Sequence, residues 1–161
     1  MEYEKEKTCC FIGHRNIENE QEIKEKLKDE TDKLINKEKV CCFLFGSKSE
    51  FDDLCYDTVT KIKEKYHHIK RIYVRAEYPY INEEYRKHIM QRYEETYYPE
   101  KIKGAGKASY IERNYEMLNK SKYCIFYYDE KYVPGKGKKS GTKIAYEYAK
   151  RKGLCIINLK K

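Results

Sequence analysis

Short apolar runs alternate along the chain with longer, mostly polar stretches. The first run, "TCCFIG", ends at Gly13 and is followed by a charged segment. A later run, "VCCFLFG", is apolar throughout, as expected for a strand that is covered on both faces. By this pattern we predict strands over residues 8–13, 39–46, 70–78, 122–128 and 154–159.

The polar stretches between these runs carry apolar residues three to four positions apart, which is typical of helices with one buried face. Ser49 stands where an N-cap is expected, and Gly153 stands where a helix should end. We predict helices over residues 18–36, 49–66, 82–98, 110–121 and 140–153.

Five strands separated by helices predict an α/β fold. The expected architecture is a Rossmann-like, doubly wound, mainly parallel sheet of about five strands with helices on both faces. A chain of 161 residues suits a single domain over residues 1–161. In such sheets, ligands bind beyond the carboxyl ends of the strands, where the strand order reverses.

Composition narrows the class of protein. The chain has 18 tyrosines and five phenylalanines, too many aromatic residues for a disordered segment. Its net charge of +8 suits an anionic partner, although most lysines fall on predicted helix faces and no basic run is dense enough for a nucleic-acid arm. A nucleic-acid partner is therefore not expected.

The seven cysteines and the charged N-terminus favour a cytoplasmic protein. No CxxC pair is present, and most cysteines lie in apolar runs, as expected for buried thiols in a reducing compartment. "MEYEKEK" does not read as a signal peptide, and no apolar stretch approaches the ~20 residues of a membrane span. Neither a metal site nor a membrane partner is expected.

Small and polar residues follow the first two predicted strands. After the first come Gly13, His14 and Arg15, where the guanidinium could bind a phosphate or the three could form an ordinary polar turn. After the second comes "FGSKSEFDDL", with Gly46 and Ser47 before a predicted helix start that would favour an anion. Asp52 in the first turn could accept a ribose hydroxyl or simply complement the helix dipole.

Two further helix starts carry candidate binding residues. In "KSGTKIAYEYA", Ser140, Gly141 and Thr142 offer N–H and hydroxyl donors to an anion, although Ser140 could equally be a plain N-cap. In "ERNYEM", Arg113 and Asn114 fall near the beginning of a predicted helix. Arg113 could bind a ligand there, or it could be an ordinary solvated arginine.

Four blocks, in order, resemble the SLOG superfamily, which is named after the DNA-processing Smf proteins and the LOG enzymes. The blocks are "CFIGHR", "FGSKSEFDDL", "ERNYEML" and "SGTKIAYEYAKRKG", and the resemblance is strongest to the small bacterial YpsA-like branch of uncharacterised proteins. It implies a Rossmann-like domain that binds a nucleotide or a nucleotide-derived ligand. The positions it singles out are Gly13, Arg15, Gly46, Ser47, Asp52, Arg113, Ser140, Gly141 and Thr142.

The chain departs from the hydrolase branch of that superfamily, which carries Pro-Gly-Gly-x-Gly-Thr-x-x-Glu and Arg-Lys-x-x-Met elements. Arg113 and Met117 keep the spacing of the second element, but Ala145 stands where the first requires its acid. Glu147 lies two residues further on, about 200° around a helix, and so faces elsewhere. The missing acid favours a binding protein over an enzyme.

Three hypotheses follow for function. The leading one is a cytoplasmic nucleotide-binding protein that senses or sequesters a phosphorylated ribonucleotide or NAD-derived ligand. The second is a nucleotide N-glycoside hydrolase with Asp52, Glu112 or Glu147 as the catalytic acid or base, and the third and weakest is a DNA-associated module. No cofactor is expected, and the resemblance implies a homodimer as a candidate assembly.

Overall fold

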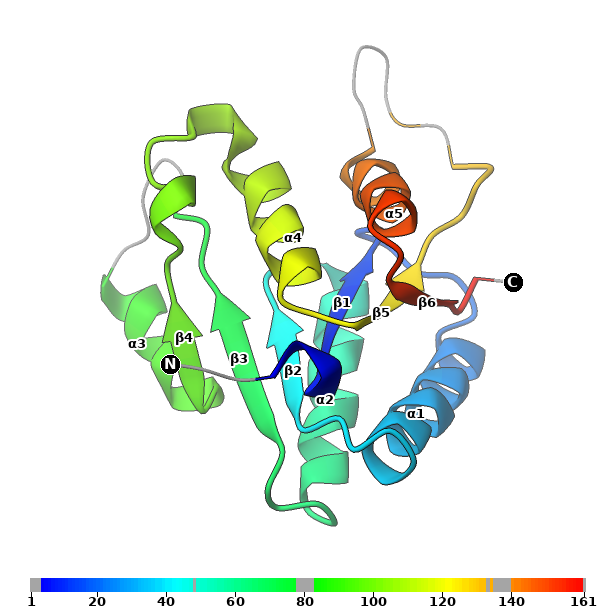
Figure 1. Cartoon of the computed structure of the whole chain (residues 1–161). Coiled ribbons are helices and arrows are strands. Elements are labelled where there is room, and N and C mark those ends of the chain that lie inside the picture. Colours follow the sequence, from blue (N-terminus) through cyan, green and yellow to red (C-terminus); the bar gives the residue numbers. More distant parts are fainter. Residues whose placement is uncertain (1–3, 48, 78–82, 133, 135–139, 161) are drawn as a thin grey trace.

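A six-stranded, all-parallel sheet forms the centre of the molecule (Figure 1). The computed structural model describes residues 4–47, 49–77, 83–132, 134 and 140–160. The strands are β1 (Thr8–Gly13), β2 (Cys42–Phe45), β3 (Lys70–Val74), β4 (Glu95–Tyr97), β5 (Tyr123–Tyr127) and β6 (Cys155–Asn158). They lie in the order β4-β3-β2-β1-β5-β6, which confirms the predicted Rossmann-like fold with one more strand than expected.

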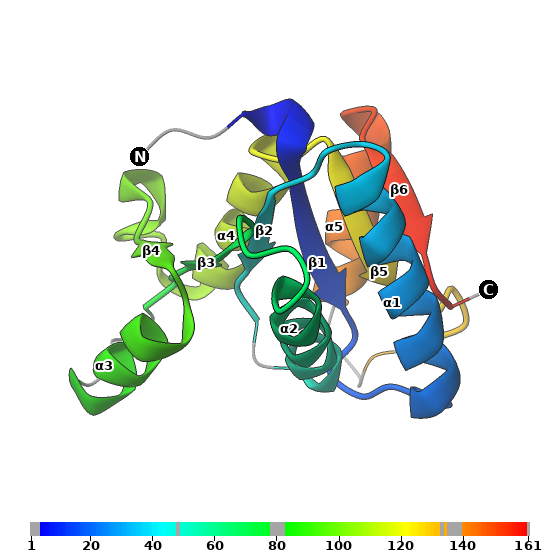
Figure 2. The ribbon, with the colours of Figure 1, turned by 90° about the horizontal axis from the view of Figure 1, so that it is seen from below.

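Five α-helices cover the two faces of the sheet (Figure 2). They are α1 (Glu20–Asn36), α2 (Glu50–Lys63), α3 (Glu83–Arg92), α4 (Ser109–Asn119) and α5 (Gly141–Arg151), and single 3₁₀ turns occur at Lys5–Lys7, Glu100–Ile102 and Gly106–Ala108. Helices α1, α2 and α3 lie on one face, and α4 and α5 lie on the other.

Alternation along the strands supplies an apolar layer to each face. Phe11, Phe43 and Phe45 pack in the core beneath α1 and α2. Their chain neighbours Cys10 and Leu44 point to the opposite face and pack in the core beneath α4 and α5. Both layers are buried, so the central strands read as continuous apolar runs in the sequence.

Strand β4 corrects the sequence prediction. We predicted one helix over residues 82–98, but α3 ends at Arg92 and β4 pairs in parallel with β3 along the edge of the sheet. Arg71 on β3 fixes this edge, because its backbone N–H and its guanidinium both donate to the Glu94 carboxylate, at 2.7 Å and 2.5–3.0 Å. The Thr96 hydroxyl also donates to the Tyr73 carbonyl, at 2.9 Å.

The capping residues expected at Ser49, Ser140 and Gly153 occupy cap positions in the structure. The Ser49 hydroxyl accepts the Asp52 backbone N–H, and the Ser140 hydroxyl accepts that of Lys143. Gly153 follows α5 with a left-handed φ of 73°, a conformation that favours glycine at the end of a helix. Within the described residues, no helix is both long enough and apolar enough to cross a membrane.

The strand order places a reversal beside β1. The chain runs outward from β1 through β2 and β3 to β4, and then returns to place β5 on the other side of β1. Helices α4 and α5 begin at the edge of the sheet where the strands end (Figure 1). This carboxyl edge is where an open parallel sheet binds its ligands, and all the candidate residues that follow β1 and β2 lie along it.

Candidate ligand-binding site

The residues after β1 tie the sheet edge together. The backbone N–H of His14 donates to the Tyr127 carbonyl at 3.2 Å, and its Nε2 accepts the Asp129 backbone N–H at 3.0 Å. Burial lowers the pKa of His14, which favours the neutral ring that this accepting nitrogen requires. His14 therefore joins the end of β1 to the end of β5, and we assign it a structural role.

Gly13 and Arg15 contact α2. A Cβ at Gly13 would lie 2.4 Å from Cδ2 of Phe51, so this glycine permits close packing of α2 on β1. The Arg15 carbonyl accepts the Glu50 backbone N–H at 2.8 Å, while the Arg15 side chain is exposed. The Arg15 guanidinium is accordingly accessible at the carboxyl edge of the sheet.

Three backbone N–H groups at the start of α2 are already bonded to the protein's own groups. The Glu50 N–H donates to Arg15, that of Asp52 to the Ser49 hydroxyl at 3.0 Å, and that of Asp53 to the Ser49 carbonyl at 3.0 Å. An anion at this helix start would have to displace these bonds. We therefore do not place a ligand phosphate there.

Gly46 and Arg113 form one packed unit. The Arg113 guanidinium donates through Nη1 to the Gly46 carbonyl, and through Nε and Nη2 to Asn114 Oδ1 at 3.4 and 3.3 Å. A Cβ at Gly46 would lie 2.5 Å from Cδ of Arg113 and 2.8 Å from Sδ of Met117. The glycine therefore makes room for a guanidinium that crosses from α4 to the end of β2.

Asp52 lies close enough to Arg113 for the two charges to interact. Its side chain is 3 % exposed, and that of Arg113 is 6 % exposed. Burial raises the pKa of Asp52 to about 7, while the Arg113 charge and hydrogen bonding from Ser47 act in the opposite direction. The Oδ1 atom of Asp52 is buried and has no hydrogen-bond partner among the residues that the structure describes.

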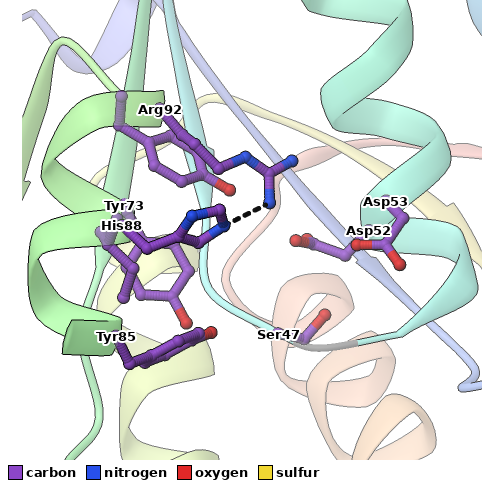
Figure 3. A pocket seen from close by; sticks show the side chains of 9 residues that line it. Ser47, Asp52, Asp53, Tyr73, Tyr85, His88 and Arg92 are labelled. Carbon is purple, nitrogen blue, oxygen red and sulfur yellow. Dashed lines mark hydrogen bonds between the residues drawn. The ribbon is translucent and has the colours of Figure 1, made fainter. Parts of the chain in front are cut away.

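A pocket of about 120 Å³ opens between α2 and α3, at the ends of β2 and β3. Figure 3 shows His88 and Arg92 of α3 facing Asp52 and Asp53 of α2 across it, with Ser47 beside the start of α2. Among the residues that the structure describes, the pocket is lined by Ser47, Asp52, Asp53, Tyr73, Tyr85, His88, Ile89, Arg92 and Tyr93.

Arg92 is held in place within this pocket. Its guanidinium carbon lies 4.1 Å from the centroid of the Tyr56 ring, and its Nη1 lies 3.4 Å from His88 Nε2. The Tyr56 hydroxyl donates to the Arg92 carbonyl at 2.6 Å, which anchors the last turn of α3 to α2. The pocket thus carries one fixed cationic side chain opposite two carboxyl groups.

Most of the pocket residues were not predicted from the sequence. Ser47 and Asp52 were expected, but Tyr73, Tyr85, His88, Arg92 and Tyr93 were not. A signal was present, because residues 85, 88, 89 and 92 fall three to four positions apart and so share one helix face. None of these four residues was among the candidate site residues.

The remaining candidates do not line this pocket. Thr142 is buried, Gly141 is exposed, and the Ser140 hydroxyl caps α5. The neighbouring lysines at 138 and 139 lie outside the described residues. Asn114 serves as the acceptor for Arg113.

Of the three candidate catalytic acids, only Asp52 lines the pocket. Glu147 is exposed on α5, and Glu112 is half-buried on α4. Ala145 is 1 % exposed and packs in the core beneath α5, so an acid at this position would be buried among apolar side chains. Within the described ranges, no three His, Cys, Asp or Glu side chains are placed to hold a metal ion together.

Comparison with known proteins adds no family assignment. No protein-family model matches the chain, and no curated protein matches it. The resemblance to the SLOG superfamily therefore stays a prediction from the four sequence blocks.

Proposed function

We propose that this protein binds a nucleotide, and that it senses or sequesters a phosphorylated ribonucleotide or NAD-derived ligand at the carboxyl edge of its sheet. One observation carries the proposal: a buried carboxyl group, Asp52, borders a ring-lined pocket at the ends of β2 and β3 and interacts with a buried guanidinium, Arg113. Buried charges in a concave site at this edge of a Rossmann-like sheet are characteristic of ligand binding.

In this proposal, different parts of the protein contact the ring and the phosphate of the ligand. The tyrosine-lined pocket suits a base or a sugar, and Arg15 together with the first turn of α5 offers a guanidinium and helix N–H groups for a phosphate. Arg113 is a positioning residue, because its guanidinium already donates to Gly46 and Asn114. The resemblance to the SLOG superfamily agrees with this class of ligand.

A second candidate function is hydrolysis of a nucleotide N-glycosidic bond. The observation that favours it is the pKa of Asp52, which burial raises to about 7, since a general acid works best with a pKa near the operating pH. Against it, Asp52 would act without the second acid that the hydrolase branch supplies, because Ala145 occupies that position. We therefore favour binding over turnover.

One experiment separates the two candidates. The purified protein is denatured, and mass spectrometry identifies the small molecules that it releases; in parallel, native protein is incubated for hours with AMP, GMP, CMP and UMP. Retained nucleotide with no free base supports the binding function. Release of free base that Asp52→Asn abolishes supports the hydrolase, and neither retained ligand nor turnover contradicts both.

A further inference from the structure

A buried carboxyl group borders the pocket between α2 and α3 (Figure 3). Asp52 is 3 % exposed and lines the pocket, and one of its carboxyl oxygens, Oδ1, has no hydrogen-bond partner among the described residues. Buried polar atoms are nearly always hydrogen-bonded in native proteins, because leaving one unpaired is costly. The acceptor atom therefore identifies the kind of group that completes the pocket, namely a hydrogen-bond donor.

The walls of the pocket suit a ring. Tyr73, Tyr85 and Tyr93 contribute three aromatic side chains, and Ile89 contributes an apolar one. Burial raises the pKa of the Tyr73 and Tyr93 phenols, so both stay neutral and can pack against an uncharged group. A volume of about 120 Å³ is close to that of a cavity of about 150 Å³ that holds one benzene molecule.

The charges of the pocket select against a phosphate. Two carboxyl groups, of Asp52 and Asp53, stand against the single Arg92 guanidinium, so an anionic group meets net repulsion. A neutral ring with a polar substituent meets no such penalty. The phosphate of a nucleotide would then lie outside this pocket, along the carboxyl edge of the sheet.

We propose that this pocket receives one neutral ring of the ligand, and that the Asp52 carboxyl group accepts a hydrogen bond from a hydroxyl or amino group on that ring. The proposal rests on the nucleotide-binding function proposed above. A nucleotide offers such a donor in two places, a ribose hydroxyl and an exocyclic amine of the base.

Asparagine at position 52 provides a sharp test. Asp52→Asn removes the carboxylate charge at nearly constant size, and with it the charge-assisted part of the accepted hydrogen bond. Asp53→Asn is the matched control, because Asp53 lines the same pocket, is next in the chain and is exposed.

Titration calorimetry at pH 8, above the raised pKa of Asp52, measures the dissociation constants of AMP, GMP, CMP, UMP, NAD and ADP-ribose for the wild-type protein, Asp52→Asn and Asp53→Asn. The tightest-binding ligand is then compared with its 2′-deoxy and 3′-deoxy forms and, where it has an exocyclic amine, with the analogue that lacks it. For one of these analogues we expect an affinity loss of about 10- to 100-fold in wild type and Asp53→Asn, the range of a charge-assisted hydrogen bond. In Asp52→Asn the same loss should be at least about 3-fold smaller, since the carboxylate charge is gone.

The outcomes separate the two proposals. The analogue that loses affinity identifies whether the sugar or the base supplies the donor. If every analogue binds wild type as tightly as the parent nucleotide, or if the loss is equal in all three proteins, the Asp52 contact is refuted while nucleotide binding stands. If no nucleotide binds wild type, the proposed function fails and the contact fails with it. If Asp52→Asn does not fold, the loss on wild type is measured at pH 5 and at pH 8: the contact predicts a smaller loss at pH 5, below the raised pKa of Asp52, and an equal loss at both pH values refutes it.

Discussion

Asp52→Asn should remove most of the fall in stability that burial of this carboxyl group causes as the pH rises. Burial raises the pKa of Asp52 from its usual value of 3.8 to about 7. Between these values the folded chain holds a proton that the unfolded chain has released, so the free energy of unfolding falls as the pH rises from about 4 to about 7. The full difference corresponds to about 4 kcal/mol, since each pH unit is worth about 1.4 kcal/mol.

Urea denaturation at pH 5 and at pH 8 measures this effect. About 2–3 kcal/mol of the total is lost between these two pH values. Asparagine does not titrate, so the stability of Asp52→Asn relative to wild type should rise by that amount from pH 5 to pH 8. Any change in the interaction with Ser47 is the same at both pH values, so it cancels when the two differences in stability between variant and wild type are compared.

The matched control is again Asp53→Asn, whose carboxyl group is exposed on the same turn of α2. This variant should keep most of the wild-type pH dependence, because burial of Asp52, and not the Asp53 charge, is the main cause of the raised pKa. Parallel curves for wild type and Asp52→Asn would refute the reasoning, because they would show that the Asp52 carboxyl group titrates at the same pH in the folded and unfolded chains.

Three further predictions concern the residues that support the site. Gly46→Ala should destabilise the fold by about 1–3 kcal/mol, because its Cβ would lie 2.5 Å from Cδ of Arg113. A Cβ at Gly141 would meet open space, so Gly141→Ala should not destabilise the fold, and thermal unfolding compares the two variants. Ser49→Ala removes the acceptor for the Asp52 N–H and should lower the free energy of unfolding, measured in urea, by about 0.5–2 kcal/mol. Ser49→Thr keeps a hydroxyl at this position and should stay within a few tenths of a kcal/mol of wild type. Arg113→Ala should lose more stability at pH 8 than at pH 5, because its charge opposes the raised pKa of Asp52; an equal loss at both pH values would contradict that coupling.

Local patterns predicted the parts of the fold whose residues are buried on both faces. The runs that became β1, β2 and β5 are apolar because helices cover both sides of the sheet. Strand β4 left no such pattern, since its three residues are half-buried at the edge of the sheet. Its conformation depends on pairing with β3 and on the contact of Arg71 with Glu94, which lie 23 residues apart. Periodicity within a window cannot report such a pairing.

In the candidate site, too, local patterns revealed some residues, and contacts between distant segments determine the others. Asp52 and Ser47 were predicted because they follow a strand that ends in glycine, a local signal. Tyr85 and Arg92 were missed because the pocket forms only when α3 folds back beside α2, which brings together residues distant in the chain. Gly13 and His14 lie where they were expected, yet their contacts are with Phe51 and Asp129, so position at the sheet edge did not by itself reveal their role.

The most direct test of nucleotide binding is a thermal-shift measurement of the wild-type protein with AMP, GMP, CMP, UMP, NAD and ADP-ribose at millimolar concentration. A ligand present at about 100 times its dissociation constant adds about 2.7 kcal/mol of stability. For a domain of this size that gain should raise the Tm by roughly 5–11 °C. We predict a rise of this order for at least one of the six ligands. A Tm that none of them moves would contradict the proposed function.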